Sequence, residues 1–409
     1  MTSRFRTWSP VVAEAGLYIY LLTVFAPGTT ALQRIALWVG FLAWLFGCAK
    51  PWLSRAFREP LLWLLIALVG WLLIGTAWSL DPALTRKTLL KTFDDYVLVI
   101  PLLVHAGAQV ASRRRLGVVL ALAGLVAVAL NALQYAMEFQ GLVPARDLYI
   151  GHRDWSYPLQ LFSPFALLMA VLANGRARVA WYLVFIVQVF MMVAAGARGG
   201  WLGFAAGLGV WLVFAANWRA IVAIAGAVLM VAGVAYLVMP EAAVKARFER
   251  GIDSSYRIGG TWGPAVEMAN DRPWTGYGFG RPLFHEEFNR RVDANPEWEI
   301  RKSAGPHSNY LEIAFAGGYP AMALLLAIYG VVLWICLRAF RTAANPAERL
   351  FALAAMNAFV SFYVVRGFVE SVRWAPLALF IGLALALSLF VAASRDGSDR
   401  SAKPGEGSG

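Results

Sequence analysis

Apolar runs long enough to cross a lipid bilayer recur along almost the whole chain. A helix needs about 20 mainly apolar residues to span the hydrocarbon core, and the 409-residue sequence holds twelve such runs between its charged, Gly and Pro clusters. Backbone groups in hydrocarbon must be satisfied within their own segment, and the runs are about twice as long as a barrel strand, so each is predicted to be a helix. The twelve predicted cores are 11–26, 31–49, 60–79, 91–108, 116–137, 156–174, 179–196, 199–217, 219–239, 306–337, 350–369 and 374–394.

The composition favours the same class, an all-α integral membrane protein with about 12 transmembrane helices. Hydrophobic residues make up 60% of the chain and charged residues 15%, whereas soluble domains carry about 25% charged residues. Cys48 and Cys336 both lie in apolar runs, which excludes a disulfide framework and a thiolate metal site. The net charge of +12 comes from basic residues that punctuate the runs, so it indicates membrane topology and not nucleic-acid binding.

Lys and Arg residues indicate the orientation of the chain, because cytoplasmic loops carry an excess of them. With the N-terminus in the cytoplasm, 17 basic residues fall in inner segments and nine in short outer loops, while ten lie in one loop too long to count. Both termini are therefore expected in the cytoplasm and the long loop outside. The predicted organisation is nine transmembrane helices in 1–239, a large outer loop with short helices in 240–305, three transmembrane helices in 306–394 and a disordered cytoplasmic tail in 395–409.

The long outer loop balances ten acidic against ten basic residues, so it is not a polybasic tail. Three short helices are predicted in it from helical spacing and a Gly stop signal. The third helix is expected to lie on the membrane surface. They cover 241–250, the stretch of Ile258, Trp262 and Ala269, and the stretch of Leu283, Phe284 and Phe288.

A Gly-rich turn follows the second of these helices. Gly276, Gly278 and Gly280 form G-x-G-x-G after a helix, without the order or the preceding strand of a dinucleotide-binding motif. We expect a tight turn that returns the loop to the bilayer, because Gly adopts backbone conformations closed to other residues.

Basic residues on the outer side break the charge rule, and charge near a membrane is retained only at some cost. Arg86, Lys87 and Lys91 cluster at the start of the fourth span, with the two lysines on one helix face. Arg198 lies in the hairpin GARGG. Such cations suit a pyrophosphate, because Arg binds phosphate oxygens through two parallel hydrogen bonds and Lys adds a point charge. Interfacial anchoring of long basic side chains explains the same pattern.

Arg366 and Glu370 lie four residues apart near the outer end of the eleventh span, with Arg373 following. At this spacing the two charges share a helix face. A buried ion pair is the alternative to a functional role for them.

Polar residues also gather in AGPHSNYLE, at the entry to the tenth span. Pro306 suits the first turn of a helix, which places His307 at the helix N-terminus, where the dipole favours a neutral imidazole. A neutral His accepts a proton near pH 7, so His307 is the predicted general base, with interfacial anchoring as the alternative. The other possible bases are Glu312, Glu370, Asp94 and Asp95. No comparable setting is seen for His105, His152 or His285, and four scattered His residues make no zinc site.

In combination these motifs resemble the bacterial O-antigen ligases, members of a superfamily of polytopic membrane ligases and polymerases. The resemblance covers the topology of most of the chain, with about twelve spans and one large outer loop before the last three. In sequence it is carried by Arg198 of GARGG, by Arg257 with Trp262 and PWTGYGFG, and by HSNYL from His307 with Gly317 and Gly318 after it.

The resemblance implies a GT-C-like glycosyltransferase of the Gram-negative inner membrane, with its active site facing the periplasm. Its substrates would be O-antigen polysaccharide on undecaprenyl pyrophosphate and a sugar hydroxyl of lipid A-core, and transfer would invert the sugar without metal or cofactor. The outer loops contain no D-x-D or E-x-D motif of the kind that holds a metal on a diphosphate. Membrane lipids are expected partners and nucleic acid is not.

The expected roles of the residues follow from this chemistry. His307 would deprotonate the acceptor hydroxyl, and Arg257 would stabilise the charge on the leaving group. The residues expected to grip the pyrophosphate are Arg198, Arg257, Arg86, Lys87 and Lys91. Arg366, Glu312 and Glu370 are expected to support the site or to replace His307 as base.

Two rival functions share these sequence features. An O-antigen polymerase uses the same donor and differs only in its acceptor, so the pyrophosphate-binding residues do not separate the two. A lipid or ion transporter is the rival from another class. The single large outer loop and the lack of paired, broken helices at the membrane midplane disfavour it.

Overall fold

All regular secondary structure in the described chain is helical. The computed structural model describes residues 2–48, 53–140, 148–195, 197–215 and 256–401, with the isolated positions 226 and 233, and no strand occurs in these segments. The α-helices are α1 (Thr2–Thr23), α2 (Thr30–Gly47), α3 (Leu53–Ala56), α4 (Pro60–Ile74), α5 (Pro82–Ala108), α6 (Val110–Phe139), α7 (Leu148–Leu172), α8 (Gly175–Ala194), α9 (Arg198–Ala215), α12 (Gly263–Asp271), α13 (Arg281–Arg291), α14 (Asn309–Thr342), α15 (Pro346–Phe359), α16 (Gly367–Val369) and α17 (Leu377–Ser401). Short 3₁₀ segments are η1 (Gly75–Trp78) and η3 (Val292–Ala294), and π-helical segments are η2 (Tyr256–Trp262) and η4 (Val360–Arg366).

Eleven of the twelve predicted spans coincide with helices in the structure. The ninth, 219–239, and the predicted short helix at 241–250 lie outside the described residues. Seven helices of the described part are long and apolar enough to cross a membrane: Thr30–Gly47, Pro60–Trp78, Val110–Met137, Asp154–Leu172, Gly175–Ala194, Asn309–Thr342 and Pro346–Val369. The helical class is therefore confirmed, while the count of twelve spans and the GT-C-like topology stay predictions.

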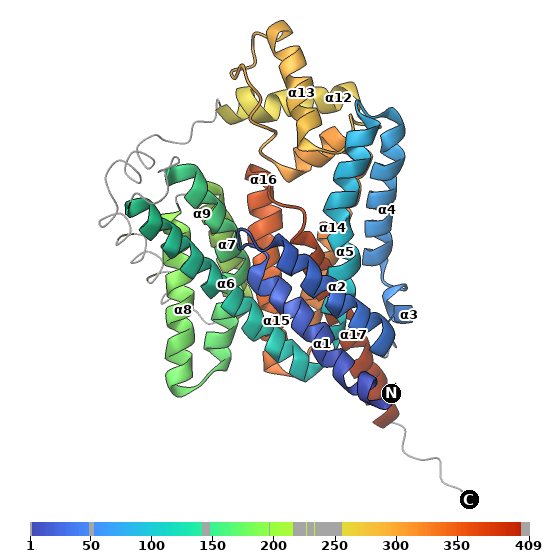
Figure 1. Cartoon of the computed structure of the whole chain (residues 1–409), viewed down its shortest axis with the longest axis vertical. Helices are drawn as coiled ribbons and strands as arrows, with labels where there is room; N and C mark the ends of the chain where they lie inside the picture. The colour runs from blue at the N-terminus through green and yellow to red at the C-terminus, as the bar shows by residue number, and fades with distance from the viewer. Residues whose placement is uncertain are drawn as a thin grey trace, which may run out of the picture.

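The helices form a bundle with a smaller helical cap at one end. Figure 1 shows α12 and α13 in the cap, while α1 begins and α17 ends at the opposite end. Glu59 at the start of α4 accepts a hydrogen bond from Ser388 of α17 at 2.6 Å, and Arg113 of α6 lies 3.7 Å from Glu348 of α15. Both contacts belong to the end away from the cap.

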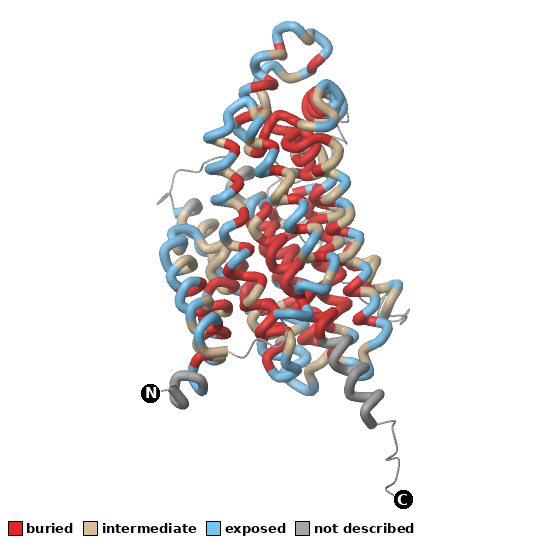
Figure 2. Tube along the Cα trace, turned by 90° about the vertical axis from the view of Figure 1, so that its right-hand side faces the viewer, coloured by how far each residue is buried: buried red, intermediate tan, exposed pale blue. Residues whose placement is uncertain are grey.

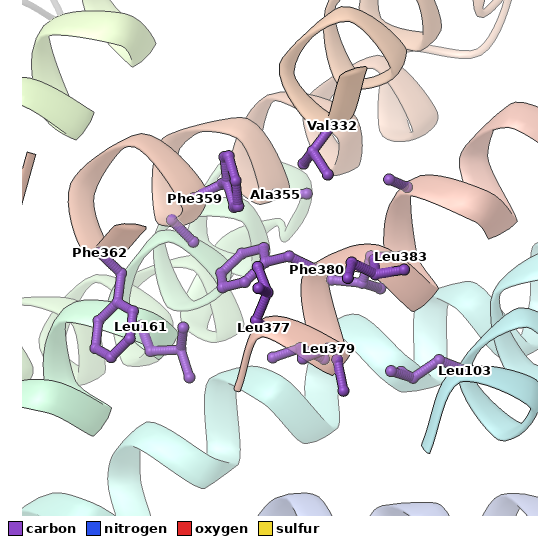
Figure 3. Packing of buried hydrophobic residues seen from close by; sticks show 14 of the residues in the cluster. Leu103, Leu161, Val332, Ala355, Phe359, Phe362, Leu377, Leu379, Phe380 and Leu383 are labelled. Carbon is purple, nitrogen blue, oxygen red and sulfur yellow. The ribbon is translucent and has the colours of Figure 1, made fainter. Parts of the chain in front are cut away.

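The centre of the bundle is built by α5, α7, α14, α15 and α17. Phe359, Leu377 and Phe380 pack there with essentially no exposed surface (Figure 3). Buried residues run through the middle of the molecule, and exposed ones lie on the outer helices (Figure 2). Large apolar side chains are among the exposed ones, including Trp63 at 55% and Trp334 at 60% exposure. Such side chains are stable facing lipid and costly facing water.

The cap has an apolar core of its own. Leu283, Phe284 and Phe288 of α13 are at most 2% exposed and pack with residues of α12, η3 and the start of α14. The predicted helix at these residues is confirmed, but its three apolar side chains are buried in the cap and do not form an exposed face for a membrane surface. The apolar side chains that suggested membrane contact are used instead to hold the cap together.

The Gly-rich turn connects cap and bundle by close backbone contact. Tyr277 N–H donates to Phe315 O at 2.8 Å and Gly278 N–H donates to Ala316 O at 3.0 Å. Gly276, Gly278 and Gly280 all have positive φ, of 63°, 107° and 146°, which fits the expected tight turn. The turn is fastened to α14 and, through Leu80 N–H and Tyr277 O, to the segment before α5.

Gly318 is the matching constraint on the α14 side. Its φ is 70°, and a Cβ added there would lie 2.4 Å from Pro273 O. Pro273 O also accepts a hydrogen bond from Tyr319 N–H at 2.7 Å, so the carbonyl cannot move away freely.

Gly318→Ala should therefore loosen the junction and lower the stability by about 1–3 kcal/mol, since it combines backbone strain with a clash. Thermal unfolding of the purified protein in detergent measures the effect. Gly330→Ala in the same helix is the matched control, because nothing lies within 4 Å of an added Cβ there. Equal unfolding temperatures for the two variants would contradict this account of the junction.

Candidate active site

A cavity of about 190 Å³ lies between the cap and the bundle. Four segments far apart in sequence line it: α7, α13, the loop before α14 and the loop after α16. The lining residues are Asp154, Tyr157, Arg281, His285, Ala304, Gly305, Pro306, His307 and Ser371. Two imidazoles, one guanidinium and one carboxylate therefore face this cavity. It is larger than the small voids of a closely packed protein core.

His307 lines this cavity, but its predicted position on a helix is wrong. Helix α14 begins at Asn309, so Pro306 and His307 belong to the preceding loop and Ser308 is the residue at the N-cap position. His307 has φ of 47°, the one non-Gly residue with positive φ in the described chain. Such a conformation costs energy and persists where the surroundings enforce it, which is typical of functional sites.

His285, which was not selected as a site residue from the sequence, shares the cavity with His307. Its Nδ1 lies 2.8 Å from the hydroxyl oxygen of Ser303. Burial and the nearby positive charge of Arg281 lower the pKa of His285 below its ordinary value, against the opposing effect of Glu312. The ring is therefore neutral at pH 7 and has a lone pair that can accept a proton.

Arg281 is held in place at the cavity wall by two partners. Its Nε lies 3.8 Å from a carboxylate oxygen of Glu312, and its Nη2 donates to Ser371 O at 3.3 Å. Glu312 also accepts a hydrogen bond from Trp374 Nε1 at 3.2 Å. Glu312 does not line the cavity, so the geometry fits its expected role as a support better than that as a base.

Arg366 lies directly behind the cavity and is completely buried. Its Nε donates to Glu370 at 2.9 Å, its Nη1 donates to Gln160 at 2.9 Å, and its guanidinium lies 3.7 Å from the ring centroid of Tyr157. Glu370 is only 3% exposed. The predicted pairing is therefore present as a buried ion pair, whose disruption typically costs about 3–5 kcal/mol because one charge is left uncompensated.

Arg257 is fastened to the same segment. It donates a hydrogen bond to Val369 O and lies 5.8 Å from the ring centroid of Trp262. The indole Nε1 of Trp262 in turn donates to His307 O at 3.5 Å. Arg257 and His307, the two residues predicted to be catalytic, are thus joined through one indole ring.

Arg198 begins α9 beside the buried ion pair. A Cβ added at Gly199 would lie 2.7 Å from the carboxyl carbon of Glu370, and one at Gly200 would lie 3.3 Å from Arg366 Nη1. The two glycines of GARGG therefore allow α9 to approach the ion pair, and Arg198 itself is exposed at this point.

The Arg86, Lys87 and Lys91 cluster lies on α5 near the cap, with all three side chains exposed. None of them forms a hydrogen bond or ion pair within the described part of the chain, and none lines the cavity. Asp94 and Asp95, two of the alternative bases, each lie 2.8 Å from Arg34 on α2. Neither aspartate lines the cavity that contains His307.

Four lining residues were missed from the sequence: Asp154, Tyr157, Arg281 and His285. A signal existed for two of them, because Arg281 and His285 are four residues apart on a predicted helix and so lie on one face of it. No sequence pattern marks Asp154 and Tyr157, which reach the site through the packing of α7.

Within the described residues, no group of three or more His, Cys, Asp or Glu side chains could hold a metal ion.

Comparison with known proteins supports one family. The sequence model of the family described as O-antigen ligase matches residues 183–326. An O-antigen ligase of Salmonella typhimurium (strain LT2) is 25% identical over 401 residues, which cover 93% of this chain and 96% of that protein. The chain is therefore similar to an O-antigen ligase along nearly its whole length. A second O-antigen ligase, from Pseudomonas aeruginosa (strain PAO1), is 28% identical over 222 residues, 51% of this chain and 48% of that protein.

The segment matched by the O-antigen ligase family contains most of the polar residues around the cavity. Arg198, Arg257, Arg281, His285 and His307 all lie in 183–326. The buried Arg366 and Glu370, and Asp154 with Tyr157 on α7, lie outside it. The family match thus covers the cationic side of the site, while the bundle helices complete it.

Proposed function

We propose that this protein is an O-antigen ligase that transfers O-antigen polysaccharide from undecaprenyl pyrophosphate to a sugar hydroxyl of lipid A-core. The similarity to O-antigen ligases supports the reaction, and the cavity between cap and bundle supports the place. The observation that carries the proposal is the convergence of Arg281, His285 and His307 on one cavity at the end of an apolar bundle, with Arg257 linked to His307 through Trp262. The lipid tail of each substrate stays in the bilayer beside the bundle.

The guanidinium groups are proposed to bind the donor pyrophosphate. Arg257 and Arg281 are each held by a backbone carbonyl, of Val369 and Ser371 respectively, which leaves other N–H groups for phosphate oxygens. Arg198 and the cluster of Arg86, Lys87 and Lys91 add positive charge at the same end of the bundle. Fixed cations stabilise the charge that develops on the leaving group without reorganising, which contributes about 3 kcal/mol per well-placed donor.

The imidazoles are proposed to activate the acceptor. The acceptor hydroxyl oxygen attacks the anomeric carbon as the bond from that carbon to the pyrophosphate oxygen breaks. The hydroxyl proton passes to His307, with His285 as the second neutral ring in reach of the cavity, and undecaprenyl pyrophosphate leaves with the electron pair. A single in-line displacement inverts the anomeric centre and needs no metal ion.

The proposed location is the inner membrane of a Gram-negative bacterium, with the cap in the periplasm and both termini in the cytoplasm. The excess of basic residues at the end away from the cap supports this orientation. It also agrees with the chemistry, because the lipid-linked donor and the cationic cavity would then lie on the same side of the membrane. The proposed topology has about 12 transmembrane helices.

Arg257→Lys tests the phosphate-binding role, because it keeps the charge and removes the planar fork. We expect the rate of transfer from purified lipid-linked O-antigen to lipid A-core to fall about 10²-fold or more. Arg338→Lys, an exposed change on α14 at the far end of the bundle, is the control and should retain activity.

Near-normal turnover by Arg257→Lys would contradict the role, and reversible loss of activity with a chelator would contradict metal independence. The same assay with a second lipid-linked chain as acceptor separates the ligase from a polymerase. Chain extension in place of transfer to lipid A-core would overturn the proposed acceptor.

The pH dependence separates the two histidines. Because the pKa of His285 is lowered from 6.5, its ring stays neutral at pH 7 and becomes charged only on acidification. The kcat/KM of the wild type should therefore decline below pH 6.5. His285→Gln, which keeps a polar group for Ser303 but cannot titrate, should remove the part of that decline that His285 contributes, and His307→Ala should lower kcat/KM about 10²-fold or more at every pH. Identical acid limbs in the wild type and His285→Gln would exclude titration of His285 as its cause.

A further inference from the structure

A second cavity, of about 890 Å³, lies at the end of the bundle away from the cap. It lies where α6, α8 and α15 begin and where α7 ends. Arg113, Arg114 and Glu348 are its charged lining residues, and the apolar ones include Leu168, Trp181 and Phe351. A mostly apolar wall with a few polar groups at one side is the usual character of a ligand-binding pocket of this size.

The polar side of this cavity is positively charged. Arg113 is buried, donates from Nε to Gly107 O at 2.9 Å and lies 3.7 Å from Glu348, so these two charges largely offset each other. Arg114 is exposed and forms no hydrogen bond or ion pair with the described part of the chain. Three helix N-termini, those of α6, α8 and α15, add their partial positive charge. The net result favours an anion beside Arg114.

The apolar side of the cavity faces the edge of the bundle. Helix α8 contributes Ala177 and Trp181 to the lining, while Val179 and Leu183 on the same helix are 59% and 56% exposed. In Figure 1, α8 lies at the margin of the bundle, beside α7 and away from the central helices. A ligand in this cavity would therefore be in direct reach of surrounding lipid.

We propose that this cavity binds an anionic glycerophospholipid of the bilayer. The phosphate is placed beside Arg114 and the N-termini of α6 and α15, and an acyl chain runs along Leu168, Trp181 and Phe351. Basic pockets between helices on the cytoplasmic side commonly bind anionic headgroups. A free phosphate ion matches the charged part of the cavity but leaves its apolar wall unfilled, whereas a phospholipid satisfies both.

Such a lipid would fill the space between α8 and the rest of the bundle. Because the cavity separates the first turns of α6, α8 and α15, occupancy would replace missing side-chain contacts among them. A ligand that binds only the folded state raises its apparent stability. This inference does not depend on the proposed ligase activity, whose site lies at the other end of the bundle.

Native mass spectrometry of the full-length protein, titrated with phosphatidylglycerol or phosphatidylcholine, tests the proposal. The wild type should bind phosphatidylglycerol more tightly, and Arg114→Gln should weaken that binding about five- to tenfold. Arg176→Gln is the matched control, because Arg176 is an exposed basic residue at the start of α8 that does not line the cavity. Its affinity for phosphatidylglycerol should stay at the wild-type value.

Ala177→Trp provides a second variant that fills the cavity instead of removing charge. It should abolish the rise in unfolding temperature that phosphatidylglycerol produces in the wild type, while inorganic phosphate should produce no rise in either protein. Equal affinities for the two lipids, an unchanged affinity in Arg114→Gln, or an equal effect of inorganic phosphate would overturn the proposal.

Discussion

The buried guanidinium of Arg366 is the interaction on which the site depends. Glu370, Gln160 and Tyr157 satisfy its charge and hold it without exposure to solvent. Because Val369 and Ser371 flank Glu370, the same contacts fix the carbonyls that hold Arg257 and Arg281. Tyr157 contacts Arg366 and also lines the cavity, so it links the buried ion pair to the cavity wall. A pair of charges is costly to bury, so its value here lies in specifying one arrangement of α7, α9 and the segment after η4.

Glycine makes that arrangement possible at two places. Gly199 and Gly200 bring α9 against the Arg366–Glu370 pair, and Gly276 with Gly318 brings the cap against α14. At each place a methyl group would enter the space of a backbone carbonyl or a buried polar group. The apolar core of the cap then keeps α13 rigid, so that His285 and Arg281 are presented to the cavity from a fixed helix.

The sequence was sufficient for the helical class, and it selected His307, which lines the candidate cavity, and the pair of Arg366 and Glu370, which is buried behind it. Hydrophobic runs dominate membrane helices, and charges that break the orientation rule mark Arg198 and Arg366. Which side chains contact one another at the site could not be predicted from the sequence. His307 was expected on a helix because Pro306 suits a first turn, yet a loop in left-handed conformation carries it. His285 was not selected because its environment, with Ser303 and Arg281 beside it at the cavity, forms only when α13 is folded against the bundle.

The most direct test asks whether the donor occupies the cavity between cap and bundle. A photoreactive amino acid at Ala304, an exposed lining residue, should form a cross-link to the sugar or pyrophosphate of lipid-linked O-antigen on illumination. The same amino acid at Ala294, exposed on the cap but outside the cavity, should form none. Cross-linking that is equal at the two positions, or confined to Ala294, would contradict the placement of glycosyl transfer in this cavity.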